Sequence, residues 1–149
     1  MIFEKVKNCL EAAGSGLKDV VNMTIYVTDM MAGGIWKVVA GEASWLVAPG
    51  TISLPNGILS DNGTLYVGSF GEGMAADMSV TTPGGLFTVD TASGAVTPVA
   101  GTEQTASVDG IARVGDWIVY NDNPTGAIHA LGADGSVVST VMGWMRLSY

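Results

Sequence analysis

The spacing of hydrophobic residues along this chain changes after residue 20. Val6, Leu10 and Ala13 recur at intervals of three and four residues, and polar residues fall largely on the other face. This spacing predicts an amphipathic helix of roughly three turns. Residues 14–16, Gly-Ser-Gly, would end the helix, because glycine readily adopts the left-handed conformation of a helix end. Residues 20–28 are rich in Val, Ile and Thr and predict a β-strand.

From Gly33 onward, short β-branched or aromatic runs alternate with turns rich in Asn, Asp and Gly. The runs fall into units of four, and the first unit has its predicted strands at 34–38, 44–47, 54–59 and 64–68. The second unit has predicted strands at 85–90, 94–99, 108–112 and 117–120, and a third begins with 126–131 and 134–139. A repeat of roughly forty to fifty residues with four strands is typical of β-propeller blades. Residues 71–84 have no clear periodicity and predict a mobile loop.

The pattern therefore predicts a mainly β fold. We expect an incomplete β-propeller of about two to three four-stranded antiparallel blades, preceded by an N-terminal helix plus strand. The chain divides into a helix–strand segment at 1–30, a partial propeller at 33–141 and a tail at 142–149. The tail carries Met142, Trp144 and Met145, and we interpret it either as an apolar patch that docks on a partner or as a frayed end.

Composition narrows the class of function. The 149 residues carry a formal net charge of −8 at pH 7, which argues against nucleic-acid binding, because phosphate contacts require clustered Lys and Arg. No run of about 18 apolar residues is present, so we expect no membrane-spanning segment. The first residues are charged where a signal peptide would be apolar, so a cytoplasmic location is the default expectation. Cys9 is the single cysteine, and its place on the predicted helix favours a buried thiol.

Residues 10–30, LEAAGSGLKDVVNMTIYVTDM, resemble the central helix-to-strand segment of the RidA family. That resemblance implies an imine or enamine deaminase whose active sites form between three subunits. The family's substrate-holding arginine stands in a Pro-Ala-Arg-Ser-type motif that has no counterpart here, and Arg113 and Arg146 stand in unrelated contexts. We interpret the segment as a packing element, with a RidA-like deaminase as the weaker alternative.

Four motifs in residues 33–141 resemble the SMP-30/gluconolactonase/LRE-like family. They are LPNGILSDNGTLYVGSF, GGLFTVDTASGAVTPVA, VDGIARVGDWIVYND and GAIHALGADGSVV. The resemblance implies descent from a six-bladed propeller that hydrolyses small sugar lactones with the help of a divalent metal ion.

The same resemblance implies a metal site at Asn56 and Asp109, with Asp109 also acting on the substrate water as the catalytic residue. We expect Ca²⁺, with Mn²⁺, Zn²⁺ or Mg²⁺ as alternatives, because hard cations prefer carboxylate and amide oxygens. The family's third ligand, a Glu, has no match, and Glu42 is not assigned because it precedes an outer-strand pattern. The alternative is that Asn56 and Asp109 are ordinary turn residues, since Asn-Gly and Asp-Gly are common hairpin signals.

Two classes of function follow from these expectations. The first is a partial propeller of sugar-lactone hydrolase descent that binds a divalent cation. The second is a non-enzymatic assembly module that forms a homo-oligomer, because two and a half blades leave sheet edges open. We expect Trp36, Trp45 and Trp117 to pack between blades, with a carbohydrate platform as the alternative. His129 lies in an alternating strand and is expected to be a half-exposed structural residue.

Overall fold

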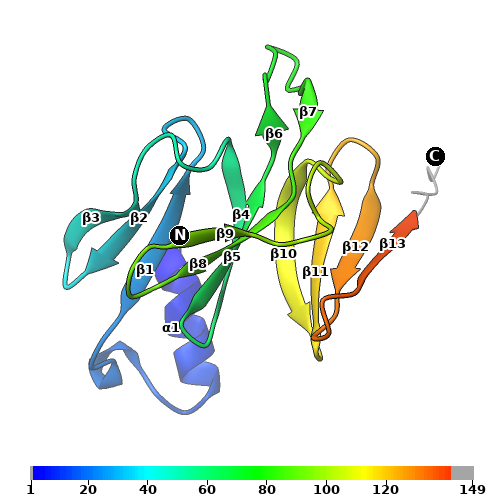
Figure 1. The fold of residues 1–149 in the computed structure, drawn as a ribbon. Helices are drawn as coiled ribbons and strands as arrows, with labels where there is room; N and C mark the ends of the chain where they lie inside the picture. Colours follow the sequence, from blue (N-terminus) through cyan, green and yellow to red (C-terminus); the bar gives the residue numbers. More distant parts are fainter. Residues whose placement is uncertain (1, 142–149) are drawn as a thin grey trace, which may run out of the picture.

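The computed structural model describes residues 2–141, and most of its regular secondary structure is antiparallel β-sheet (Figure 1). The chain begins with helix α1 (Ile2–Ala12) and a 3₁₀ turn (Leu17–Asp19). The first sheet contains β1 (Thr24–Asp29), β2 (Gly34–Val39) and β3 (Glu42–Val47). The second contains β4 (Pro55–Asp61), β5 (Thr64–Ser69), β8 (Leu86–Asp90) and β9 (Val96–Pro98). The third contains β10 (Val108–Val114), β11 (Trp117–Asp122), β12 (Ala127–Leu131) and β13 (Val137–Val141).

The predicted mainly β class is confirmed, and in each sheet the strands are hydrogen-bonded in chain order. The predicted strands are present, but their predicted grouping into sheets was wrong, because each boundary between sheets lies two strands earlier than expected. The runs at 54–59 and 64–68 pair with those at 85–90 and 94–99, not with the two runs before them. Short turns such as Asn62-Gly63, with φ of 45° and 83°, connect neighbours within a sheet, whereas the longer connections at 48–54 and 99–107 pass to the next sheet.

The segment at 71–84, which we expected to be a loop, forms a small hairpin at its base. β6 (Gly71–Glu72) pairs with β7 (Thr82–Pro83), and this hairpin projects beyond the ends of the neighbouring strands (Figure 1). Gly71 has a φ of 133°, and a Cβ there would lie 2.3 Å from the carbonyl oxygen of Thr82. Glycine is therefore required at the point where β5 continues into β6.

The three sheets pack face to face, and the second sheet is covered on both sides. Between the first and second sheets lie the buried residues Ile35, Val47, Ile52, Leu65, Val67 and Val89. Between the second and third lie Leu86, Ala106, Val108, Ile118, Tyr120 and Leu131. Full burial of each large aliphatic side chain contributes about 1.5–3 kcal/mol, so these two layers are the main source of the fold's stability. The first strands of the sheets, β1, β4 and β10, lie next to one another along the stack.

The N-terminal segment joins the first sheet through one strand. β1 pairs along its whole length with β2, and the Thr28 hydroxyl donates a hydrogen bond of 2.7 Å to the carbonyl oxygen of Asn56. The segments at 1–30 and 33–141 therefore share a sheet, although their separate ancestry stays a prediction. The strand begins at Thr24 and not at the predicted residue 20, and Val21 is fully exposed.

Helix α1 is mostly exposed, and only Val6 and Leu10 are half-buried among its residues with described side chains. Cys9 is exposed, so the predicted buried thiol was wrong, because no sheet covers that side of the helix. Among residues 2–141, no helix has the length and apolar character needed to cross a membrane. The predicted tail with Met142, Trp144 and Met145 lies outside the described residues.

Candidate functional site

Asn56 and Asp109 occupy equivalent places in two strands that lie side by side. Each is the second residue of the first strand of its sheet, β4 for Asn56 and β10 for Asp109. The strand register shifts between Pro55 and Ile58 in β4 and between Val108 and Ile111 in β10. A β-bulge re-aims the side chains that it contains, so both residues leave the regular alternation of their strands.

The two side chains meet around the carboxylate of Asp109. Asn56 Nδ2 donates a hydrogen bond of 2.8 Å to Asp109 Oδ1, and Asn123 Nδ2 donates one of 3.3 Å to Asp109 Oδ2. Asp109 and Asn123 are exposed, whereas Asn56 is half-buried. Asn56, Asp109 and Asn123 form what we call the Asp109 cluster.

Backbone contacts hold the cluster in place. A Cβ on Gly57 would lie 2.7 Å from the carbonyl oxygen of Asp109, so only glycine lets β4 and β10 approach this closely. On the other side, the Gly110 amide donates a hydrogen bond of 2.6 Å to Asn121 Oδ1. The Asn123 amide donates one of 3.0 Å to the Ser107 carbonyl. The bulge in β10 is therefore held by β4 on one side and by β11 and the turn after it on the other.

Asn123 is the member of the cluster that the sequence did not reveal. It lies in the turn after β11, where the buried carboxylate of Asp122 accepts hydrogen bonds from the Ser107 amide (2.8 Å) and the Thr125 hydroxyl. The run Asp-Asn-Pro-Thr-Gly at 122–126 is an evident turn signal. Nothing in that signal indicates that the turn lies beside Asp109, 14 residues earlier.

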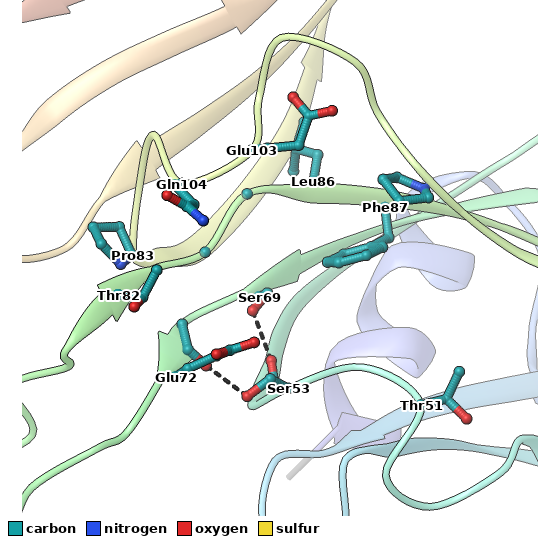
Figure 2. Close-up of a pocket in the computed structure, with 14 residues that line it drawn as sticks. Thr51, Ser53, Ser69, Glu72, Thr82, Pro83, Leu86, Phe87, Glu103 and Gln104 are labelled. Atoms are coloured by element: carbon teal, nitrogen blue, oxygen red, sulfur yellow. Dashed lines mark hydrogen bonds between the residues drawn. The ribbon is translucent and has the colours of Figure 1, made fainter.

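Two cavities lie at this end of the sheets. One, of about 600 Å³, lies between the β6–β7 hairpin and the β11–β12 turn, and its lining includes Phe70, Met78 and Asn123. The other, of about 340 Å³, is drawn in Figure 2 and is lined in part by Ser53, Ser69, Glu72, Glu103 and Phe87. Only the first cavity includes a residue of the Asp109 cluster.

The two serine hydroxyl groups in the cavity of Figure 2 donate hydrogen bonds to backbone carbonyls, and its two glutamates lie far from each other. Ser69 Oγ donates to the Ser53 carbonyl at 2.6 Å, and Ser53 Oγ donates to the Gly71 carbonyl at 2.7 Å. Glu72 and Glu103 are exposed and lie on opposite sides of the cavity (Figure 2). This cavity therefore brings together no pair of groups arranged for acid–base work.

The Asp109 cluster offers oxygen ligands but only one carboxylate. Within residues 2–141, no group of three or more His, Cys, Asp or Glu side chains is placed to hold a metal ion. Glu42 pairs with Val39 at the end of the first sheet away from Thr28, so it does not join the cluster. A carboxylate and amide oxygens suit a hard cation by chemistry, but in this structure the amide nitrogens of Asn56 and Asn123 face Asp109. The cluster also has fewer charged ligands than high-affinity calcium sites have.

His129 lies elsewhere and is buried, so its predicted half-exposure was wrong. Its ring stacks on that of Tyr120, its neighbour across β11 and β12, with a centroid distance of 5.0 Å. Burial raises the pKa of the Tyr120 phenol, and the Thr105 hydroxyl partly offsets this shift. The pair packs in the layer between the second and third sheets, which is a structural position.

The tryptophans expected between blades lie on outward faces. Trp36 and Trp45 stack with ring centroids 3.6 Å apart, on the side of the first sheet opposite to the buried Ile35 and Val47. Trp117 precedes the buried Ile118 and points away from the second sheet. Within the described residues, none of the three rings lies between two sheets.

Comparisons with known proteins give little guidance. No protein-family model matches the chain, and no curated protein matches it. Among solved structures, the chain is similar to the one entitled "Crystal structure of the computationally designed Ika4 protein", with a TM-score of 0.46 and 16% sequence identity. The alignment covers 80% of this chain and spans 61% of the length of that protein.

Proposed function

We propose that the three sheets are consecutive blades of a β-propeller of sugar-lactone hydrolase descent, and that the Asp109 cluster binds a divalent cation. The stacking of the sheets and the adjacency of β1, β4 and β10 support the propeller interpretation, because the first strands of propeller blades surround a common axis. The motifs around Asn56 and Asp109 support the descent.

The observation that carries the proposal is the meeting of Asn56 with Asp109. The two residues are 53 positions apart, stand before glycines in matching bulges, and hydrogen-bond to each other at 2.8 Å. Ordinary hairpin-turn residues would lie between paired strands, whereas both of these lie near the start of a strand and face one another. This placement favours a shared ligand site over two independent turns.

The chemistry follows from the side chains. The Asp109 carboxylate supplies the negative charge, and the amides of Asn56 and Asn123 each supply an oxygen as well as a nitrogen. A bound divalent cation would polarise a lactone carbonyl and lower the pKa of a water molecule. Asp109 would accept the proton of the attacking water, because its carboxylate is exposed and would lie beside the bound cation and its water.

One carboxylate limits the expected affinity. Calcium sites gain affinity with the number of charged ligands, and sparse sites bind at roughly 10⁻⁴ to 10⁻³ M. We therefore expect weak binding of Ca²⁺ or Mn²⁺ by the Asp109 cluster. Hydrolysis is a separate step that requires substrate to bind beside the cluster.

Calorimetric titration with Ca²⁺ and with Mn²⁺ tests the cation site. The parent protein should give binding heat, and Asp109→Asn should lose it. The matched control is Asp116→Asn, which removes the same charge from the exposed β10–β11 turn and should bind like the parent. No heat from the parent, or equal heat from Asp109→Asn, would overturn the cation site.

Hydrolysis of a sugar lactone, followed by acid release in weak buffer, tests the enzymatic part. The parent should show cation-dependent turnover that Asp109→Asn lacks and Asp116→Asn keeps. Cation binding without turnover would leave a binding module. The second candidate function, an assembly module, is favoured by the mainly apolar outward faces of the first and third sheets, and it leads to the inference below.

A further inference from the structure

We infer that the outward face of the first sheet binds the outward face of the third sheet of a second copy of this chain. The inference depends on the stacking of the sheets and not on the proposed cation site. We call the first surface the front face, and its residues are Ile25, Val27, Trp36, Val38, Ala43 and Trp45. We call the second the rear face, and its residues are Ala112, Val114, Trp117, Val119, Ile128, Ala130 and Val138.

Strand alternation assigns these residues to the outward side. In the first sheet, Ile35 and Val47 point inward and are buried, so Trp36 between Ile35 and Lys37 points outward. In the third sheet, the buried Ile118 and Tyr120 point inward, so the intervening Val119 points outward. Both faces are mainly apolar, with Asp29 at the edge of the front face and Asn121 at the edge of the rear face. Val27, Val114 and Val138 are exposed.

Lys37 and Arg113 turn away from the outward faces, whereas Asp29, at the end of β1, accepts a hydrogen bond of 3.4 Å from Trp36 Nε1 on the front face. Lys37 lies on β2 but its Nζ donates a hydrogen bond of 3.1 Å to the Thr91 carbonyl in the second sheet's β8–β9 turn. Arg113, between Ala112 and Val114 on β10, forms an ion pair with Asp61 at the end of β4. A sheet face that is exposed to solvent would carry more of its charged side chains outward. The arrangement seen here therefore favours front and rear faces that a binding partner covers.

The packing of the second sheet indicates what covers the front and rear faces. Its second sheet presents one apolar face to the first sheet and another to the third, and both are buried. In the described residues, the first sheet has no sheet on its front face, and the third has none on its rear face. A rear face placed on a front face would repeat the sheet-on-sheet contact that the chain already makes twice.

Such a contact joins two different surfaces, so it is heterologous and leaves one front face and one rear face free in a dimer. The front face, the smaller of the two, is roughly 20 Å long and 15 Å wide, from three strands of about six residues. This footprint is well below the ~800 Å² per partner of a standard stable interface. We therefore expect weak, reversible association.

Sedimentation velocity over a wide range of protein concentration tests the inference. Val27→Lys places a charge on the front face and Val138→Lys places one on the rear face, where the parent side chains are 46% and 49% exposed. A lysine at either place is therefore tolerated in the monomer. Leu17→Lys is the matched control, because this leucine is 50% exposed, much like the two valines, and belongs to neither face.

The parent and Leu17→Lys should show masses that rise with concentration, whereas Val27→Lys and Val138→Lys alone should remain monomeric. An equimolar mixture of the two variants should form a dimer and nothing larger, because one keeps its rear face and the other keeps its front face. Circular dichroism checks that each variant is folded. A parent that stays monomeric up to several hundred micromolar, or a single variant that still dimerises, would overturn the inference.

Discussion

At the scale of single residues, two motifs that look alike in the sequence have unequal surroundings. Asn56-Gly57 and Asp109-Gly110 stand at matching bulges in β4 and β10. A Cβ on Gly57 would lie 2.7 Å from the Asp109 carbonyl oxygen, whereas a Cβ on Gly110 would first meet Asn121 Oδ1 at 3.4 Å. Gly57 therefore sets the distance between the two strands, and Gly110 does not.

We predict that Gly57→Ala destabilises the protein by about 1–3 kcal/mol, because the added methyl group must displace backbone. Gly110→Ala should cost less than about 0.5 kcal/mol, because its neighbour is a side-chain atom at ordinary contact distance. Urea denaturation followed by tryptophan fluorescence measures both changes. Equal costs for the two variants would contradict the unequal packing of the two glycines.

The candidate site was only partly predictable at this scale. The resemblance of the two motifs to one family implied that Asn56 and Asp109 act together, and their side chains are in contact. Asn123 was missed because its turn reaches Asp109 only after β10 and β11 have paired. Side-chain burial was also hard to predict, since Cys9 and His129 follow clear periodic patterns but depend on which elements cover them.

At the scale of elements, the strands were predictable and their partners were not. Turn residues such as Asn62-Gly63 locate hairpins directly. The pairing of β5 with β8 spans the β6–β7 insertion, and no local signal distinguishes a long loop within a sheet from one that leaves it. The same limit applies to residues 1–30, where the sequence predicted the helix and the strand but not that the helix is mostly exposed while the strand joins a sheet.

We predict that deletion of residues 2–13, which removes α1, lowers the free energy of unfolding by less than about 1.5 kcal/mol. The helix is mostly exposed and buries only parts of Val6 and Leu10 among its described side chains, and a partly buried aliphatic residue contributes a fraction of the ~1.5–3 kcal/mol of full burial. Thermal and urea denaturation of the truncated chain measure the change.

Deletion of residues 2–30 is the comparison, because it also removes β1. That strand pairs with the whole of β2, packs Tyr26 against the first buried layer and supplies the Thr28 bond to Asn56. We expect this longer deletion to abolish cooperative unfolding. A stable, cooperative protein without residues 2–30 would show that β1 is dispensable.

At the scale of the whole molecule, stability should be graded along the stack of sheets. The second sheet is packed on both faces, and Leu65 and Val67 of its β5 are fully buried. The first sheet is packed on one face, and its edge strand β3 pairs with β2 alone. Local opening costs least where few apolar contacts must be broken, so the outer strand should open before the inner one.

Hydrogen exchange should therefore be slowest for the amides of β5 and faster for those of β3, when measured by mass spectrometry on peptides from a dilute sample. Self-association through the front face would change this order, because a second copy would then cover β2 and β3. Their exchange should slow as protein concentration rises, while exchange in β5 stays constant. Val27→Lys should remove the concentration effect and leave the gradient intact. Uniform exchange across the three sheets in dilute solution would mean that the stack opens as one unit. The sheets with uncovered outward faces would then be no less stable locally than the second sheet, and a partner could not stabilise them selectively.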